Sequence, residues 1–245
     1  MTLLAVERIK LFTTRSPWWC IVLAIVLPVG FAALLSGLAR GNAEPISVTA
    51  TQTGYAFGMV VVMVMAALSV TTEYRFGTMR TTFQAVPNRI AVLLAKTTVV
   101  ALVAGVVGEI AAFASWALVR AIRPGPQLAL NSEHAWRAVA GVGLVYLIAA
   151  VIALAVGILV RQSAGAISIL LVYTLLVESL VTLIPTVGDK IHDWMPFNVA
   201  DNFLSAGSSG GGRAAAAASG VSLGPWASLG YFAAIAAVLL VVALV

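Results

Sequence analysis

The chain has 245 residues, of which 61% are hydrophobic and only 9% are charged, and its formal net charge is +5. Soluble domains carry about 25% charged residues, so a chain this apolar requires lipid as its solvent. A helical span needs roughly 20 apolar residues, which gives this length about six spans and leaves no room for a separate soluble catalytic domain. The positive charge lies in loops that flank apolar runs, which indicates membrane orientation, and no nucleic-acid partner is expected.

Successive apolar stretches predict an all-α, polytopic membrane protein that forms one transmembrane domain over residues 1–245. The first span starts cleanly, because Ser16 can cap it and Pro17 suits the first helical position. The six predicted spans cover about 18–38, 52–72, 90–119, 136–160, 164–184 and 226–245. As a helix the third stretch would be about 45 Å long at 1.5 Å per residue, so it tilts or projects from the bilayer.

The connections between the spans differ greatly in length. Residues 161–163 form a very tight turn between the fourth and fifth spans. Residues 187–225 form the longest loop, and its first half mixes Trp194, Phe197 and Phe203 with acidic residues. That mixture predicts a short amphipathic helix at a membrane surface. The second half, SAGSSGGGRAAAAASG, is of low complexity and is expected to be flexible.

Basic residues predict how the spans are oriented. With the N-terminus inside, the inner segments hold eight basic residues against six in the outer loops. The inner set is Arg8, Lys10, Arg15, Arg75, Arg80, Arg89, Lys96 and Arg161. The bias increases when the longest loop is discounted, because the rule counts short loops near the membrane. We therefore expect a multi-pass protein of the cell membrane with both termini in the cytoplasm.

The inner segment EYRFGTMRTTFQAVPNR, residues 73–89, is the most informative part of the chain. Drawn as a helix over about 73–86, it places Phe76, Met79, Phe83 and Val86 within an arc of about 80°. Its charged residues lie beside or opposite that stripe. The pattern predicts an amphipathic helix parallel to the membrane that presents charges to a partner in the cytosol. A simple interfacial helix that orients two spans explains the same pattern.

Residues 72–96, TEYRFGTMRTTFQAVPNRIAVLLAK, resemble the signature of the ABC type-2 permease family. In that family an acidic residue, an arginine, Gly-Thr and a second arginine form a coupling helix after the second span, and a proline and a lysine follow. The matching residues here are Glu73, Arg75, Gly77, Thr78, Arg80, Pro87 and Lys96. VERIKLFTTRSPWW is similar to the family's amphipathic elbow over residues 3–15, with Glu7, Lys10 and Arg15 matching, although Leu3 to Phe12 has no clean apolar face.

The resemblance implies a membrane subunit of an ATP-driven exporter. Such permeases pair as homo- or heterodimers, and each docks on a separate ATPase subunit that grips the coupling helix and the elbow. The chain contains no G-x-x-x-x-G-K-[ST] phosphate loop, so ATP and Mg²⁺ would be bound by the partner, and no cofactor is expected here. The resemblance implies a hydrophobic or amphipathic cargo, exported through spans embedded in membrane lipid.

Two acids inside the predicted spans are further candidates. Glu109 lies in the third span and Glu178 in the fifth. An ionisable residue there costs at least ~2.5 kcal/mol on insertion scales, so it usually faces protein or a water-filled cavity. Each acid is either a polar contact along an export path or a structural acid that is hydrogen-bonded to neighbours such as Ser115, Ser179 or Thr182.

Signatures of enzymes are missing from the sequence, which contains no H-E-x-x-H, no G-x-S-x-G and no Cys/His cluster. We therefore expect a chain without catalytic or metal-binding residues of its own. Two alternatives to the exporter remain at this point. One is a secondary transporter or channel that works without ATP, and the other is a membrane subunit for sensing or assembly. Neither explains a charged amphipathic helix before the third span as directly.

Overall fold

A computed structural model describes residues 3–38, 46–86, 88–184, 188–206 and 223–245, and the regular structure in these ranges is helical. Its main elements are α1 (Leu3–Thr13), α2 (Arg15–Leu38), α3 (Val48–Thr51), α4 (Tyr55–Arg75), α5 (Thr78–Ala85), α6 (Arg89–Ile122), η2 (Pro126–Leu128), α7 (Glu133–Val160), α8 (Ser163–Val172), η3 (Tyr173–Val177), α9 (Glu178–Val181), α10 (Gly188–His192), α11 (Pro196–Ser205) and α13 (Pro225–Leu244). The predicted coupling-helix stop Pro87 and the low-complexity half of the longest loop lie outside the described residues.

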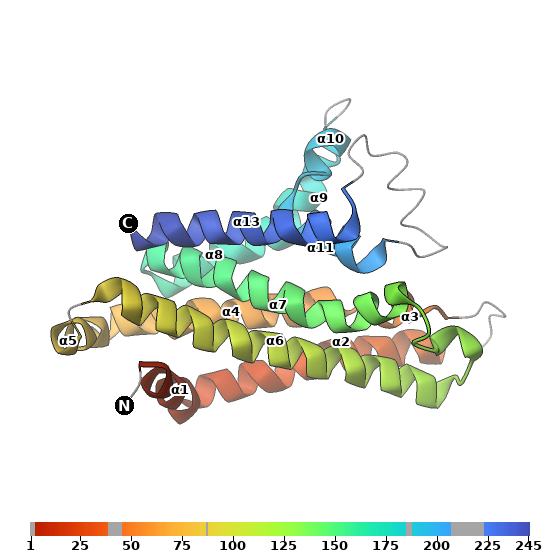
Figure 1. Ribbon diagram of the computed structural model, residues 1–245, viewed down its shortest axis with the longest axis horizontal. Helices are drawn as coiled ribbons and strands as arrows, with labels where there is room; N and C mark the ends of the chain where they lie inside the picture. Colours follow the sequence, from red (N-terminus) through yellow and green to blue (C-terminus); the bar gives the residue numbers. More distant parts are fainter. Residues whose placement is uncertain (1–2, 39–45, 87, 185–187, 207–222) are drawn as a thin grey trace.

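Six helical segments are long and apolar enough to cross a membrane. They are α2, α4, α6, α7, the segment Ser163–Val181 and α13. Five of them run along the long axis of the molecule, whereas Ser163–Val181 rises obliquely away from the bundle toward α10 (Figure 1). The all-α, six-span architecture predicted from the sequence is therefore confirmed, and the chain is a multi-pass membrane protein. The third span is the longest at 34 residues.

Helix α7 forms the centre of the bundle. It packs against α4, α6 and α13, and most of its residues are buried. Close approach depends on small residues: a Cβ added at Gly108 of α6 would lie 2.8 Å from the ring of Tyr146 on α7. By contrast, α2, the segment Ser163–Val181 and α13 bury less than a quarter of their most apolar stretches. These three segments present the faces that lipid covers.

The ends of the spans differ from those predicted. The second span was predicted over 52–72, whereas α4 runs from Tyr55 to Arg75 and so includes Glu73. The fifth is interrupted by η3, a π-helical turn immediately before Glu178. Between the fourth and fifth spans, Arg161 adopts a left-handed conformation with φ 57° and its N–H donates to the carbonyl of Gly157. Gln162 then caps α8, so only two residues separate two spans.

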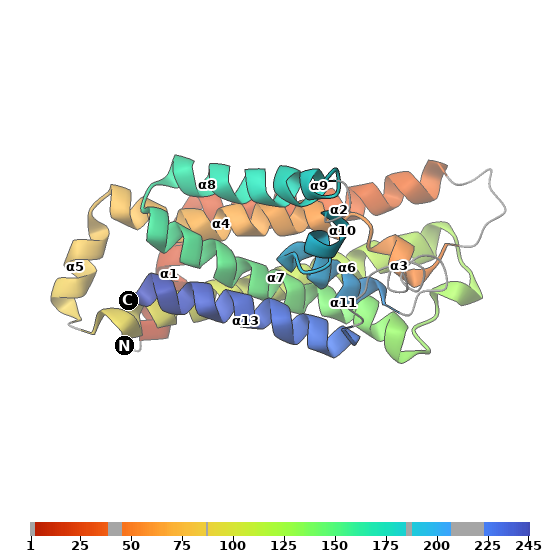
Figure 2. The same cartoon turned by 90° about the horizontal axis from the view of Figure 1, so that it is seen from above.

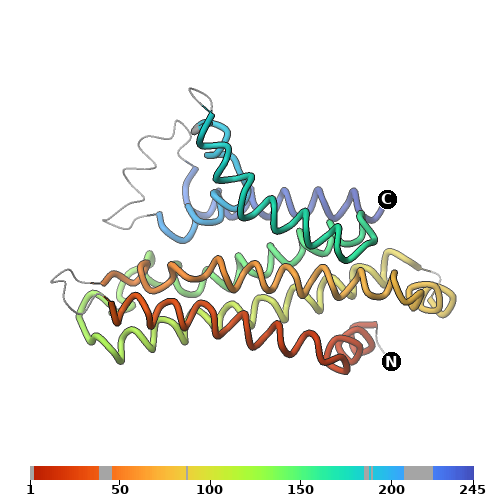
Figure 3. The backbone as a smooth tube through the Cα atoms, turned by 180° about the vertical axis from the view of Figure 1, so that it is seen from behind, coloured from red at the N-terminus to blue at the C-terminus, as the bar shows by residue number. Residues whose placement is uncertain are grey.

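The two ends of the bundle carry different elements. Helices α1 and α5 lie at one end, together with the C-terminus (Figure 2). Helix α3 and the segment between α6 and α7 lie at the other end, and the view from behind shows the same separation (Figure 3). We call these the α5 end and the α3 end.

Candidate functional site

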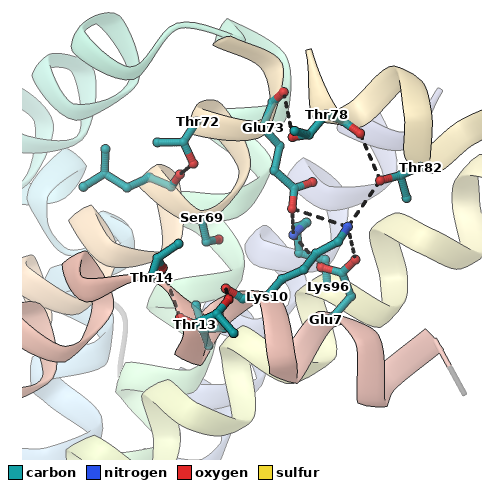
Figure 4. Close-up of polar contacts among 12 residues, drawn as sticks. Glu7, Lys10, Thr13, Thr14, Ser69, Thr72, Glu73, Thr78, Thr82 and Lys96 are labelled. Atoms are coloured by element: carbon teal, nitrogen blue, oxygen red, sulfur yellow. Dashed lines mark hydrogen bonds and ion pairs between the residues drawn. The ribbon is translucent and has the colours of Figure 1, made fainter. Parts of the chain in front are cut away.

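Four charged side chains from three helices meet at the α5 end, and we call them the four-charge cluster. They are Glu7 and Lys10 of α1, Glu73 of α4 and Lys96 of α6 (Figure 4). The Lys96 ammonium donates to Glu7 Oε2 at 2.5 Å and to Glu73 Oε1 at 3.0 Å. Lys96 therefore joins α6 to both α1 and α4.

Lys10 extends the cluster to α5. Its ammonium donates to Glu7 Oε1 at 3.0 Å and lies 3.6 Å from Glu73 Oε1. It also donates to the hydroxyl of Thr82 in α5 at 3.2 Å. The short helix α5 is thus hydrogen-bonded to α1 through the side chain that also contacts α4.

Burial makes this arrangement energetically demanding. Glu7 and Lys96 are each only 4% exposed. A buried charge is tolerated when it is paired and hydrogen-bonded, and here two carboxylates face two ammonium groups. This pairing also explains why α1 has no clean apolar face: its buried residues are Leu11 and, one turn earlier, Glu7.

Gly77 separates α4 from α5. Its φ of 71° lies in the left-handed region, which glycine adopts without a steric penalty. The predicted single helix over 73–86 is therefore wrong in its boundaries, because Glu73 and Arg75 belong to α4 and α5 begins at Thr78. The predicted apolar stripe is broken at the same point. Phe76 is 72% exposed, whereas Met79 is buried.

The residues predicted to contact a cytosolic partner divide into two groups. Glu7 and Glu73 face the protein interior, and Lys10 is half-buried beside them. Arg75, Thr78 and Arg80 are exposed around Gly77, and Arg15 is exposed at the start of α2. Lys96 was matched to the family motif but was not singled out as a site residue. Its position as a lysine within a long apolar run could have indicated that it pairs with an acidic residue of another helix.

Glu109 contacts the neighbouring helix α7. A Cβ added at Gly143 would collide with the Glu109 carboxyl group, so this glycine makes room for the acid. Within the described residues, no hydrogen bond to the Glu109 side chain is observed, and the residue is half-buried. The predicted partner Ser115 donates to the carbonyl of Ala111 in its own helix.

Glu178 has a different partner from those predicted. Its carboxyl group accepts a hydrogen bond from the backbone N–H of Phe197 at 3.0 Å, at the start of α11. The hydroxyls of Ser179 and Thr182 donate to carbonyls of their own segment instead. The first N–H groups of a helix lack partners within it, so Glu178 serves as an N-terminal cap supplied by another helix.

Arg137 of α7 holds the opposite end of α11. Its Nε donates to the carbonyl of Phe203 at 2.9 Å, and its guanidinium also donates to the carbonyl of Ala206. We call Glu178 and Arg137 the α11 clamp. Between them, Phe197, Phe203 and Leu204 are buried against α7 and α13. The predicted amphipathic helix exists, and its apolar residues pack on the bundle.

In the described ranges, no group of three or more His, Cys, Asp or Glu side chains is placed to hold a metal ion. No protein-family model matches this sequence, and no curated protein matches it either. The chemistry available at the α5 end is therefore that of the four-charge cluster and of the exposed arginines beside it.

Proposed function

We propose that this chain is the membrane subunit of an ATP-driven exporter of the ABC type-2 permease kind, with α5 as its coupling helix and α1 as its elbow. One observation carries the proposal. The exposed helix α5 is hydrogen-bonded through Thr82 to Lys10, which belongs to a buried cluster that joins α1, α4 and α6. A displacement of α5 would therefore be passed on to three other helices.

In this proposal a separate ATPase subunit contacts the exposed face around Gly77. Arg75, Thr78 and Arg80 are the residues available for that contact, and guanidinium groups are well suited to carboxylates and carbonyls on a partner. The four-charge cluster acts one step behind this surface. It keeps the inner ends of α1, α4 and α6 together, so that movement of α5 shifts them as a unit.

The remaining parts of the assembly follow from the same proposal. ATP and Mg²⁺ are bound by the ATPase subunit, and a second permease subunit completes the transport path for a hydrophobic or amphipathic cargo. The α5 end faces the cytoplasm, as does each terminus. The basic residues at this end support that orientation, because short cytoplasmic loops are enriched in lysine and arginine.

An ATP-independent transporter or channel receives less support. That class uses intramembrane acids along a substrate or proton path. Glu178 is instead engaged in capping α11, and Glu109 packs against Gly143. A sensor or assembly subunit would not require α5 to be connected to α1 and to two spans.

The proposal is tested by co-purification with a candidate ABC ATPase subunit. Replacing Arg75 and Arg80 together with alanine should weaken complex formation about tenfold or more, because arginines often dominate an interface. Thr82→Val should leave binding intact and lower the ATP hydrolysis that transport requires. Lys190→Ala, an exposed change in α10, is the control and should have no effect. Undiminished complex formation by the double arginine variant would contradict the proposed docking surface.

A further inference from the structure

A groove of about 490 Å³ opens at the α5 end, and its lining includes the four-charge cluster and Thr78. Its apolar walls include Met65 and Leu68 of α4 and Val99 and Val100 of α6. Its polar end is formed by the C-terminal part of α1, the start of α2 and the last turns of α4. The exposed Trp18 and Trp19 follow directly on the first turn of α2, as expected for a membrane interface.

Hydroxyl groups line the polar end, and four of them already donate their protons within the protein. Those of Thr13 and Thr14 donate to carbonyls of α1, and those of Ser69 and Thr72 donate to carbonyls of α4. Figure 4 shows Thr13 and Thr14 across from Ser69 and Thr72, with the cluster beside them. What these hydroxyls offer to a ligand is therefore the lone pairs of their oxygens.

The charged groups at this end also leave a hydrogen-bond acceptor without a donor. Glu73 Oε1 accepts from Lys96, but Glu73 Oε2 is buried and has no hydrogen-bond partner in the described part of the chain. The ammonium groups of Lys10 and Lys96 are already paired with carboxylates. The groove consequently presents hydrogen-bond acceptors above an apolar floor, and a ligand that fits it must bring donors and a hydrocarbon chain.

We propose that this groove binds phosphatidylethanolamine from the bilayer leaflet at the α5 end. The primary ammonium of that headgroup carries three N–H donors, as a lysine does, and meets the Thr and Ser oxygens and Glu73. One acyl chain lies along Met65, Leu68, Val99 and Val100. Arg15 stands between the groove residues Thr14 and Ser16, is exposed, and supplies a guanidinium for the phosphate.

The headgroup chemistry separates this lipid from its neighbours in a membrane. Phosphatidylcholine has a quaternary ammonium without any N–H, so it cannot donate to the acceptors. Phosphatidylglycerol has hydroxyl donors but no cationic group, so it cannot make a charge-paired hydrogen bond to Glu73. The inference does not depend on an ATPase partner, so the exporter proposal and this one can fail separately.

The test is native mass spectrometry of the purified chain in detergent. The chain is titrated with phosphatidylethanolamine, its N-methyl and N,N-dimethyl derivatives, phosphatidylcholine and phosphatidylglycerol, all with the same acyl chains. Affinity should fall at each methylation and end about tenfold lower for phosphatidylcholine, as expected for the loss of a charge-assisted hydrogen bond. Equal affinity across the series, or tighter binding of phosphatidylglycerol, would overturn the proposal.

Two variants locate the site. Ser69→Phe fills the groove and should abolish the preference for phosphatidylethanolamine. Ser179→Phe is the matched control, because Ser179 also donates to its own helix but is exposed on α9. Thr72→Val keeps the side-chain shape, removes one acceptor oxygen, and should lower the preference about threefold by weakening one neutral hydrogen bond. An unchanged preference in both Ser69→Phe and Thr72→Val would place the lipid elsewhere.

Discussion

The four-charge cluster and the α11 clamp hold together opposite ends of the same bundle by different means. At the α5 end, carboxylates and ammonium groups from three helices contact one another. At the α3 end, Glu178 and Arg137 contact backbone groups at the two termini of one short helix. The four-charge cluster depends on the charge of each of its four side chains. The α11 clamp depends on two side chains and on a helix of the right length between them.

This difference determines what each end can tolerate. Loss of one member of the cluster leaves an opposite charge buried without its partner. Loss of one clamp residue leaves a backbone group unsatisfied, which is a smaller penalty. The cluster should therefore be the more sensitive of the two.

Lys96→Met tests that ranking and should have the largest effect. It removes the buried cation of the cluster and leaves Glu7 and Glu73 to share only the half-buried Lys10. We therefore expect a loss of about 3 kcal/mol in the free energy of unfolding. Thermal unfolding in detergent measures it. Lys190→Met, an exposed change, should stay within about 0.5 kcal/mol of the parent.

The same experiment has an internal check. Replacing the whole cluster at once with Glu7→Gln, Lys10→Met, Glu73→Gln and Lys96→Met should recover most of the loss, because it removes the buried charges together. A quadruple variant as unstable as Lys96→Met alone would show that packing, and not charge pairing, determines the stability of this end.

Glu178→Ala tests the clamp and should lower the free energy of unfolding by about 2 kcal/mol, since the N–H of Phe197 loses a carboxyl acceptor. Glu178→Gln retains a side-chain oxygen and should be nearly neutral. Hydrogen exchange over residues 196–205 would report the same order. Equal destabilisation by both variants would mean that the clamp works through charge and not through helix capping.

The smallest effect is expected at Gly77, the connection next to the cluster. Gly77→Ala should destabilise by about 1 kcal/mol, because a left-handed conformation strains a residue with a Cβ. No atom lies within 4 Å of the added carbon, so crowding contributes nothing. Gly230→Ala in α13 is the matched control, with the same open surroundings and no positive φ. It should be neutral or slightly stabilising in thermal unfolding, which gives the two changes opposite signs.

The spans were predictable because lipid imposes one simple requirement, a long apolar helix, and composition displays it directly. The end of the second span was not. Glu73 is polar and was assigned to the start of a separate coupling helix, but pairing with Lys96 allows it to remain in α4. A prediction made from single residues cannot include a partner that lies 23 positions further along the chain.

The α11 clamp was harder to predict for a related reason. Glu178 and Arg137 contact an N–H and two carbonyls, and these groups occur in every residue that is not proline. The amino-acid sequence therefore does not indicate which backbone groups Glu178 and Arg137 contact. Gly77 was different: it was quoted in the family motif, yet only its backbone angle shows that it separates two helices.

The two-residue connection at Arg161 and Gln162 has a consequence for biogenesis. Only two residues separate α7 from α8, so the two helices form a tight hairpin. We expect this hairpin to insert into the bilayer as one unit, with the Arg161 guanidinium over the ring of Tyr74 at its tip. Insertion of the central helix of the bundle is thereby tied to insertion of one of its most lipid-exposed neighbours.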